Sequence, residues 1–151
     1  MILYLDTSAL VKKYIAEPGS DVVNQAIGDA EIVGLSIMER VEVAAALAKA
    51  VRMDAITRDE GLVALQLFRS EWSSMMHIQA SEMVVARADS MAWEYHLRGH
   101  DAVHLASAVL WQESLGRPLT MAVFDQKLWT VAQQVGLTPF PADLTAFMGG
   151  E

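Results

Sequence analysis

The chain has 151 residues, of which 53% are hydrophobic and 20% are charged, a balance that excludes a disordered chain and favours a folded domain. Its 11 Lys and Arg against 19 Asp and Glu give a formal net charge of −8, which argues against binding nucleic acid or anionic membranes through overall charge. The absence of cysteine excludes disulfides, thiolate metal sites and a cysteine nucleophile.

Targeting signals are not recognisable in the sequence. No apolar run approaches the roughly 18 residues of a membrane span, and the first ten residues lack the basic region of a signal peptide. A chain without cysteine needs no oxidising compartment. We therefore expect a cytoplasmic protein with no membrane attachment.

Short apolar runs alternate with helical patterns along the chain. In chain order, we expect a strand at 2–5, helices at 8–16 and 21–27, a strand at 31–35, helices at 37–51 and 54–73, a strand at 76–80, helices at 81–97 and 101–115, a strand at 119–124, a helix at 126–135, a strand at 138–140, and one or two helical turns within 142–148. This alternation predicts a single domain over residues 1–151, a three-layer α/β/α sandwich around a parallel sheet of about five strands.

Two helix starts carry capping signals. Ser36 and Glu39 have the Ser-x-x-Glu spacing of a capping box, which predicts that a helix begins at residue 37. Asp101 is expected to cap the helix over 101–115, because Asp is a favoured N-cap residue.

Four acidic residues occupy positions that the predicted sheet can bring together. Asp6 directly follows the first strand, and Asp125 directly follows the strand over 119–124. Glu42 is the only charge in the apolar segment VEVAAALA, and Asp101 begins a helix. Since sites form where the carboxyl ends of parallel strands share an edge, these carboxylates can converge there. Each also has a simpler interpretation, because the three aspartates can cap helices and Glu42 can be solvated.

Carboxylates that gather in one place need a neutralising cation. Oxygen ligands without cysteine favour Mg²⁺ or Mn²⁺ over a structural Zn²⁺, and such ions support hydrolysis of a phosphodiester. Basic residues lie near the acids in sequence and are candidates for phosphate contacts: Lys12, Lys13, Arg40, Arg98 and Lys127. Isolated surface cations are also common, so that interpretation stays open.

Four segments of the chain together resemble a known family. MILYLDTSALVK, SIMERVEVAAAL, LRGHDAVHLASAV and VFDQKLW are similar to the acidic motifs of the PIN-domain nucleases, in an order and spacing most similar to the VapC-type toxins of bacterial toxin–antitoxin pairs. The resemblance covers the chain from Met1 to about Phe140. It implies a PIN-like α/β/α fold and a Mg²⁺- or Mn²⁺-dependent endoribonuclease that acts on structured RNA. It also implies a cognate antitoxin that occludes the site, and a homodimer.

The resemblance also implies roles for individual residues. Asp6, Glu42, Asp101 and Asp125 correspond to the acidic metal site of the family, and Ser8 corresponds to the small polar residue that supports it by hydrogen bonding. Many members have Thr or Ser two residues before the fourth acid, where this chain has Val123. That departure predicts weaker polar support for the fourth acid.

Two other functions remain open from the sequence. A catalytically silent PIN-like module would bind RNA or a protein partner without cutting it. A different metal-dependent phosphohydrolase, acting on DNA or a small phosphoester, would use the same four acids.

A zinc site is a weaker interpretation. His96, His100 and His104 are spaced by four residues, as on one face of a helix that binds zinc. The Arg98-Gly99 pair predicts a helix break among them, so the three imidazoles are not expected to stack.

A hydrolase triad is also disfavoured. Asp101, His104 and Ser107 lie on one predicted helix, where the imidazole cannot point between the other two side chains. His104 is instead expected to pack or form a hydrogen bond near Asp101.

The helix over 54–73 carries an apolar stripe of Leu62, Leu65, Phe68 and Trp72. Such a stripe belongs to the core by default. Two methionines follow it, so part of the stripe is also a candidate surface for a second copy or an antitoxin.

Overall fold

A computed structural model describes residues 1–148, so the last three residues of the predicted 1–151 domain lie outside the described residues. Its strands are β1 (Ile2–Leu5), β2 (Ile32–Ser36), β3 (Met76–Ile78), β4 (Leu119–Ala122) and β5 (Thr138–Phe140). They form one sheet in the order β3-β2-β1-β4-β5, and every neighbouring pair is parallel. The predicted parallel sheet of five strands is therefore confirmed.

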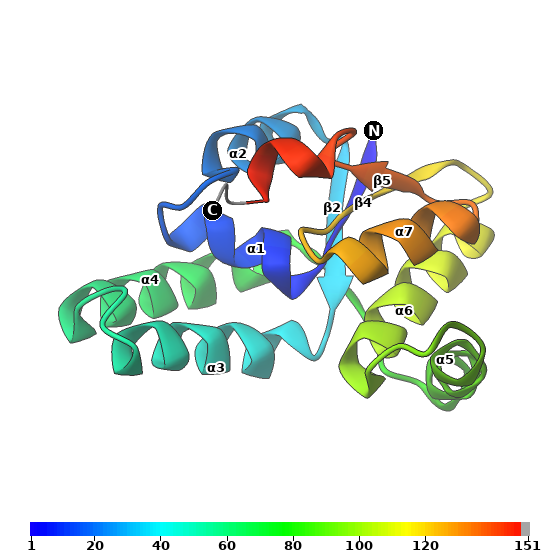
Figure 1. The fold of residues 1–151 in the computed structure, drawn as a ribbon, viewed down its shortest axis with the longest axis horizontal. Coiled ribbons are helices and arrows are strands. Elements are labelled where there is room, and N and C mark those ends of the chain that lie inside the picture. Colours follow the sequence, from blue (N-terminus) through cyan, green and yellow to red (C-terminus); the bar gives the residue numbers. More distant parts are fainter. Residues whose placement is uncertain (149–151) are drawn as a thin grey trace.

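Helices cover both faces of this sheet (Figure 1). One face carries α1 (Thr7–Tyr14), α2 (Ser20–Asp29), α3 (Glu39–Arg52) and α4 (Arg58–Glu71), and the other carries α5 (Glu82–Tyr95), α6 (Gly99–Leu115) and α7 (Gln126–Gln134). Short 3₁₀ turns occur at η1 (Trp72–Ser74) and η2 (Leu144–Phe147). Within residues 1–148, no helix combines the length and apolar character needed to cross a bilayer.

The side chains of β1 divide the core into two layers. Ile2 and Tyr4 point to the layer built with α5, α6 and α7, whereas Leu3 and Leu5 point to the layer built with α1 to α4. This follows from the alternation of side chains along a strand that is buried on both faces. The predicted α/β/α sandwich is thus confirmed.

Two of the predicted helix caps are wrong, and the helix expected over 54–73 begins only at Arg58. Ser36 and Glu39 do not form a capping box: the Ser36 hydroxyl accepts a hydrogen bond from the Met38 amide, and Glu39 points into the protein. Helix α3 therefore begins at Glu39 rather than at residue 37. Asp101 does not cap α6, because that helix begins at Gly99 and Asp101 lies in its first turn.

The apolar stripe on α4 is divided between core and surface. Phe68 is fully buried, whereas Leu62 is 51% exposed. Between α3 and α4 lies an apolar hollow of about 250 Å³ whose lining includes Leu62 and Leu65. Part of the stripe is therefore core, and whether a partner covers the rest stays a prediction.

Gly34 provides a direct test of packing across the sheet. A Cβ atom on Gly34 would lie 2.4 Å from the Trp111 ring, and Trp111 is nearly buried. We expect Gly34→Ala to reduce the free energy of unfolding by about 1–3 kcal/mol through overpacking, measured by urea denaturation.

Gly28→Ala is the matched control for this substitution. Gly28 lies within α2, and a Cβ atom there meets nothing within 4 Å. Alanine should leave stability unchanged or increase it by up to about 1 kcal/mol, because Gly is a poor helix former. Equal effects of the two substitutions would contradict the observed packing.

Candidate active site

Asp6 lies at the carboxyl end of β1, and its two carboxylate oxygens have different partners. Oδ2 caps α1 by accepting hydrogen bonds from the Ser8 amide at 3.2 Å and the Ser8 hydroxyl at 2.6 Å. Oδ1 faces the His104 imidazole at 3.9 Å. The Ser8 hydroxyl also accepts from the Phe124 amide at 2.9 Å, which ties the end of β1 to the segment after β4. Asp6 is therefore both a helix cap and a member of a buried cluster.

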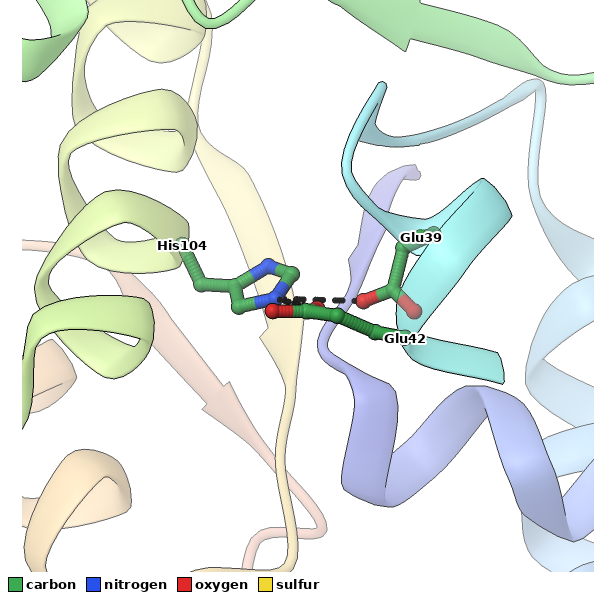
Figure 2. Close-up of side chains that lie close together, drawn as sticks. All are labelled: Glu39, Glu42 and His104. Carbon is green, nitrogen blue, oxygen red and sulfur yellow. Dashed lines mark hydrogen bonds and ion pairs between the residues drawn. The ribbon is translucent and has the colours of Figure 1, made fainter. Parts of the chain in front are cut away.

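The side chains of Glu39, Glu42 and His104 point toward one another (Figure 2). Asp6 adjoins them through the contact of its Oδ1 with His104. Both glutamates project from the first turn of α3, and the imidazole projects from α6 on the opposite face of the sheet. His104 Nε2 lies 2.6 Å from Glu42 Oε2 and 3.2 Å from Glu39 Oε1. We refer to Asp6, Glu39, Glu42 and His104 as the carboxylate–imidazole cluster.

Thr7 and Tyr4 complete the polar contacts of this cluster. Thr7 Oγ1 lies 2.7 Å from Glu39 Oε1 and 2.8 Å from Glu42 Oε2, so both carboxylates compete for one hydroxyl proton. The Tyr4 hydroxyl lies 2.8 Å from His104 Nδ1, and this contact fixes the plane of the imidazole. Glu39 Oε2 is buried and has no hydrogen-bond partner within residues 1–148.

Burial and neighbouring charges shift the pKa values of the cluster. Burial raises the pKa of Glu39 to about 8, although His104 and Thr7 partly oppose this shift. Burial alone would lower the pKa of His104, but the hydrogen bond to Glu42 and the charges of Asp6 and Glu39 raise it to about 9. For Glu42, burial raises the pKa, and the contacts with His104 and Thr7 outweigh it, so the net shift is downward. At neutral pH, His104 therefore carries a proton and neutralises part of the carboxylate charge.

Asp101 and Asp125 form a second acidic group next to this cluster. Arg98 Nε lies 3.0 Å from Asp101 Oδ2, and a terminal nitrogen of Arg98 lies 3.7 Å from Asp125 Oδ2. Asp125 also caps α7, since its Oδ1 accepts from the Leu128 amide at 2.9 Å. The hydrogen bond to Asp101 raises the pKa of Arg98, and the charges of Asp125 and Asp6 contribute to this shift. The four acids predicted from the sequence thus lie in two adjacent groups at one edge of the sheet.

The predicted phosphate contacts have different environments. Lys12 pairs with Glu17 at 3.3 Å, and Lys13 pairs with Glu71 at 2.6 Å, both from the last turn of α1. Arg98 pairs with the second acidic group as described. The remaining two, Arg40 in the first turn of α3 and Lys127 in the first turn of α7, lie close in sequence to Glu42 and Asp125. Their predicted contacts with phosphate remain predictions.

Sequence reasoning missed two members of the cluster. The Ser-x-x-Glu spacing assigns Glu39 to a capping box. The signal against that assignment is the presence of two glutamates about one helical turn apart, directly before the apolar run VAAALA. His104 was expected near Asp101, but its ring contacts Glu42, Glu39 and Tyr4 instead. These partners lie 62 or more positions away in sequence, so no local pattern shows them.

The two competing constellations are excluded by geometry. The Ser107 hydroxyl donates to the Val103 carbonyl oxygen at 2.7 Å, so it does not pair with His104 as in a hydrolase triad. His96 ends α5 in a left-handed conformation, and His100 and His104 belong to the next helix, so the three imidazoles do not share one helix face. Among residues 1–148, Glu39, Glu42 and His104 are the one set of three side chains whose potential metal-ligand atoms all lie within 4.8 Å of one another.

Val123, two residues before Asp125, is fully buried in the layer with α6 and α7. Its amide donates to the Phe140 carbonyl oxygen at 2.9 Å, and its side chain offers no polar support. Asp125 is held instead by the Leu128 amide and Arg98.

Comparisons with known proteins show the family and the fold of this chain. Ribonuclease VapC45 of Mycobacterium tuberculosis (strain CDC 1551 / Oshkosh) is 34% identical over 144 residues, which cover 95% of this chain and 97% of the relative. The structure of PAE2754 from Pyrobaculum aerophilum has a TM-score of 0.65 at 20% identity, covering 97% of this chain and 95% of its own. A toxin–antitoxin complex from Klebsiella pneumoniae has a TM-score of 0.61 at 21% identity, covering 85% of this chain and 90% of its own. No protein-family profile matches the chain. With a relative this similar over nearly its whole length, the chain belongs to the VapC family of PIN-domain ribonucleases.

The raised pKa values predict how stability depends on pH when no metal is bound. The pKa of His104 in the folded protein, about 9, exceeds its ordinary value of 6.5. The stabilisation of the fold by protonated His104 is therefore complete below pH 6.5 and is lost as the pH rises through 9. The raised pKa of Glu39 acts in the same direction, because deprotonation leaves a buried charge. We expect the free energy of unfolding in EDTA to fall between pH 6.5 and 9, measured by urea denaturation.

Glu39→Gln is the informative variant for this prediction. The substitution removes one titrating carboxylate and part of the field that charges His104. Its stability should therefore vary less than that of the wild type over the same range. A wild type whose stability is flat or rises with pH would contradict the charge distribution described here.

Proposed function

We propose that this protein is a Mg²⁺- or Mn²⁺-dependent endoribonuclease, the toxin of a toxin–antitoxin pair, acting in the cytoplasm. Asp6, Glu42, Asp101 and Asp125 would bind one or two divalent ions. The observation that carries the proposal is the position of Asp6 between the two groups of acids. Its Oδ1 faces His104 within the carboxylate–imidazole cluster, and its charge helps to raise the pKa of Arg98, which holds Asp101 and Asp125. Membership of the VapC family supports the same assignment.

The residues at this edge of the sheet fit a divalent cation. Glu39 Oε2 is a buried carboxylate oxygen without a hydrogen-bond partner in the described chain, and oxygen atoms of this kind are ligands for Mg²⁺ and Mn²⁺. The carboxylates of Asp6, Glu39 and Glu42 share a single imidazole, so further positive charge would lower their repulsion.

The protein's own residues would orient the reacting groups. A bound divalent ion activates water and neutralises the charge that develops on a phosphodiester. Ser8 fixes the rotamer of Asp6 through the hydrogen bond to Oδ2, which leaves Oδ1 directed at the site. Tyr4 fixes the His104 ring through Nδ1, and His104 in turn holds the Glu42 carboxylate through Nε2. Arg98, whose side chain is 68% exposed, offers N–H donors to a phosphate beside Asp101.

The substrate and partners are part of the same proposal. The substrate would be structured RNA, such as transfer or ribosomal RNA, and a cognate antitoxin would cover the site. The similarity in fold to a toxin–antitoxin complex supports an antitoxin partner. We propose a homodimer on the basis of family membership, and we propose that residues 1–151 form one domain.

Asp6→Asn should abolish cleavage while the fold is kept. The amide can still cap α1 through its oxygen, but it removes a negative ligand from the site. Since loss of a group that merely supports a ligand costs 10- to 100-fold, we expect the rate to fall by at least about 100-fold. The measurement is Mn²⁺-dependent cleavage of a mixed transfer-RNA pool, with circular dichroism to confirm folding.

Asp89→Asn serves as the control, since Asp89 is an exposed aspartate on α5 and its replacement should leave the rate unchanged. An Asp6→Asn protein that is folded and cuts RNA at the wild-type rate would show that the acids do not act in catalysis. A wild type that binds RNA without cutting it would indicate a silent binding module. Cleavage of DNA but not RNA would indicate a different phosphohydrolase.

A further inference from the structure

Two exposed arginines lie at the starts of helices, one in each helical layer. Arg98 precedes α6 and is engaged by Asp101 and Asp125. Arg40 lies in the first turn of α3, between Glu39 and Glu42 in sequence, and its side chain is exposed. The first turn of α3, which carries Arg40, follows the carboxyl end of β2 (Figure 1), so Arg40 lies at the edge of the sheet where the acidic groups meet.

Arg40 differs from its neighbours in what its charge contacts. In the part of the chain that the structure describes, no carboxylate lies within ion-pair distance of the Arg40 guanidinium, whereas Lys12, Lys13 and Arg98 each have one. The guanidinium lies instead over the Trp72 ring, 5.4 Å from its centre. A cation–π contact of this kind holds the side chain without neutralising its charge.

Trp72 is itself held in place. The His77 imidazole stacks on its ring at 4.0 Å with an angle of 17° between the planes, and His77 Nε2 lies 2.7 Å from the Trp72 carbonyl oxygen. Phe68, which is fully buried, meets the indole edge-on at 5.6 Å. The surface on which Arg40 rests is therefore anchored to the core, and Arg40 loses less freedom on binding than an arginine in solvent.

The cation–π contact leaves the donors of the Arg40 guanidinium available. Among residues 1–148, none of its N–H groups forms a side-chain hydrogen bond, and such donors match the oxygens of a phosphate. Lysine cannot combine the two contacts in this way, because its ammonium is a compact point charge. The chain has a net charge of −8, which repels the anionic backbone of a nucleic acid. A cation held in place at the edge that carries the acids would offset this repulsion for one phosphate of the substrate.

We propose that Trp72 positions Arg40 to bind a phosphate of the substrate RNA at the rim of the active site, on the side opposite to Arg98. The proposal rests on the proposed ribonuclease function. It assigns Arg40 to substrate binding and Trp72 to positioning, and neither residue takes part in the chemical step.

Arg40→Ala and Arg52→Ala form a matched pair for the first test. Both arginines are exposed and belong to α3, but they lie at its opposite ends, about 18 Å apart along the helix. Arg40→Ala should raise KM for a mixed transfer-RNA pool roughly tenfold with kcat unchanged, because a phosphate contact is lost. Arg52→Ala should leave both parameters unchanged. Arg40→Lys should restore only part of the loss.

Salt dependence provides a readout that needs no cleavage. In the Asp6→Asn background, binding of the same RNA pool is measured over a range of salt concentrations. Adding Arg40→Ala should lower the slope of log affinity against log salt by about 0.7 to 0.9, the value for one phosphate contact, and Arg52→Ala should not change it.

Trp72→Leu tests the positioning role. It should raise KM in the wild-type background but add little when Arg40 is already alanine, since the two residues act as one unit. Trp72→Phe should have a smaller effect, because Phe is a weaker cation–π partner. Trp72 is partly buried, so thermal unfolding of each variant is measured alongside, and Trp72→Phe replaces Trp72→Leu if the latter does not fold.

Arg40→Ala behaving like Arg52→Ala in both KM and salt slope would overturn the proposal, and the guanidinium would then be a candidate contact for a carboxylate of a protein partner. Additive effects of Arg40→Ala and Trp72→Leu would overturn the positioning role alone.

A wild type that binds RNA but does not cut it would contradict the ribonuclease function, while the salt slope would still decide the role of Arg40. A wild type that neither binds nor cuts RNA would overturn both.

Discussion

The buried imidazole of His104 is the contact on which the proposed active site depends. Asp6, Glu39 and Glu42 all direct a carboxylate oxygen at its Nε2, and Tyr4 fixes the ring from the other side. Without a positive charge in their midst, three carboxylates in so small a space would repel one another strongly. Since His104 comes from α6 and the glutamates come from α3, this one contact also joins the two helical layers across the edge of the sheet.

The two roles weighed for the aspartates, helix cap and site residue, turn out to be compatible. Asp6 and Asp125 each use one oxygen to cap a helix and present the other to a charged neighbour. A cap fixes the rotamer of a carboxylate, and a fixed rotamer is what a metal ligand or a substrate contact needs. In a parallel sheet, strand ends and helix starts coincide at the carboxyl edge, so the caps of α1 and α7 are brought to the same place.

Much of this arrangement could be predicted from the sequence, because the information is local. Strand and helix patterns alternate clearly enough to give the parallel sheet. Asp6 follows β1 directly, and Asp125 follows β4 after two residues, because that strand ends at Ala122 rather than at the expected residue 124. Glu39 could not be placed in this way, because Ser36 and Glu39 match a capping box while the actual partners of Glu39 lie 32 and 65 positions away (39 − 7 and 104 − 39). The pairing of Arg40 with Trp72 was hidden for the same reason, since it depends on how α3 packs beside the end of α4.

Calorimetric titration of Mn²⁺ into the metal-free protein tests the central claim most directly, with wild type and the Asp6→Asn/Asp101→Asn double variant compared at the same pH. The wild type should bind Mn²⁺, and the double variant should show no binding although it remains folded, because each substitution removes a carboxylate charge from one of the two acidic groups. A folded wild type that binds no Mn²⁺, or a double variant that binds it equally well, would contradict the account.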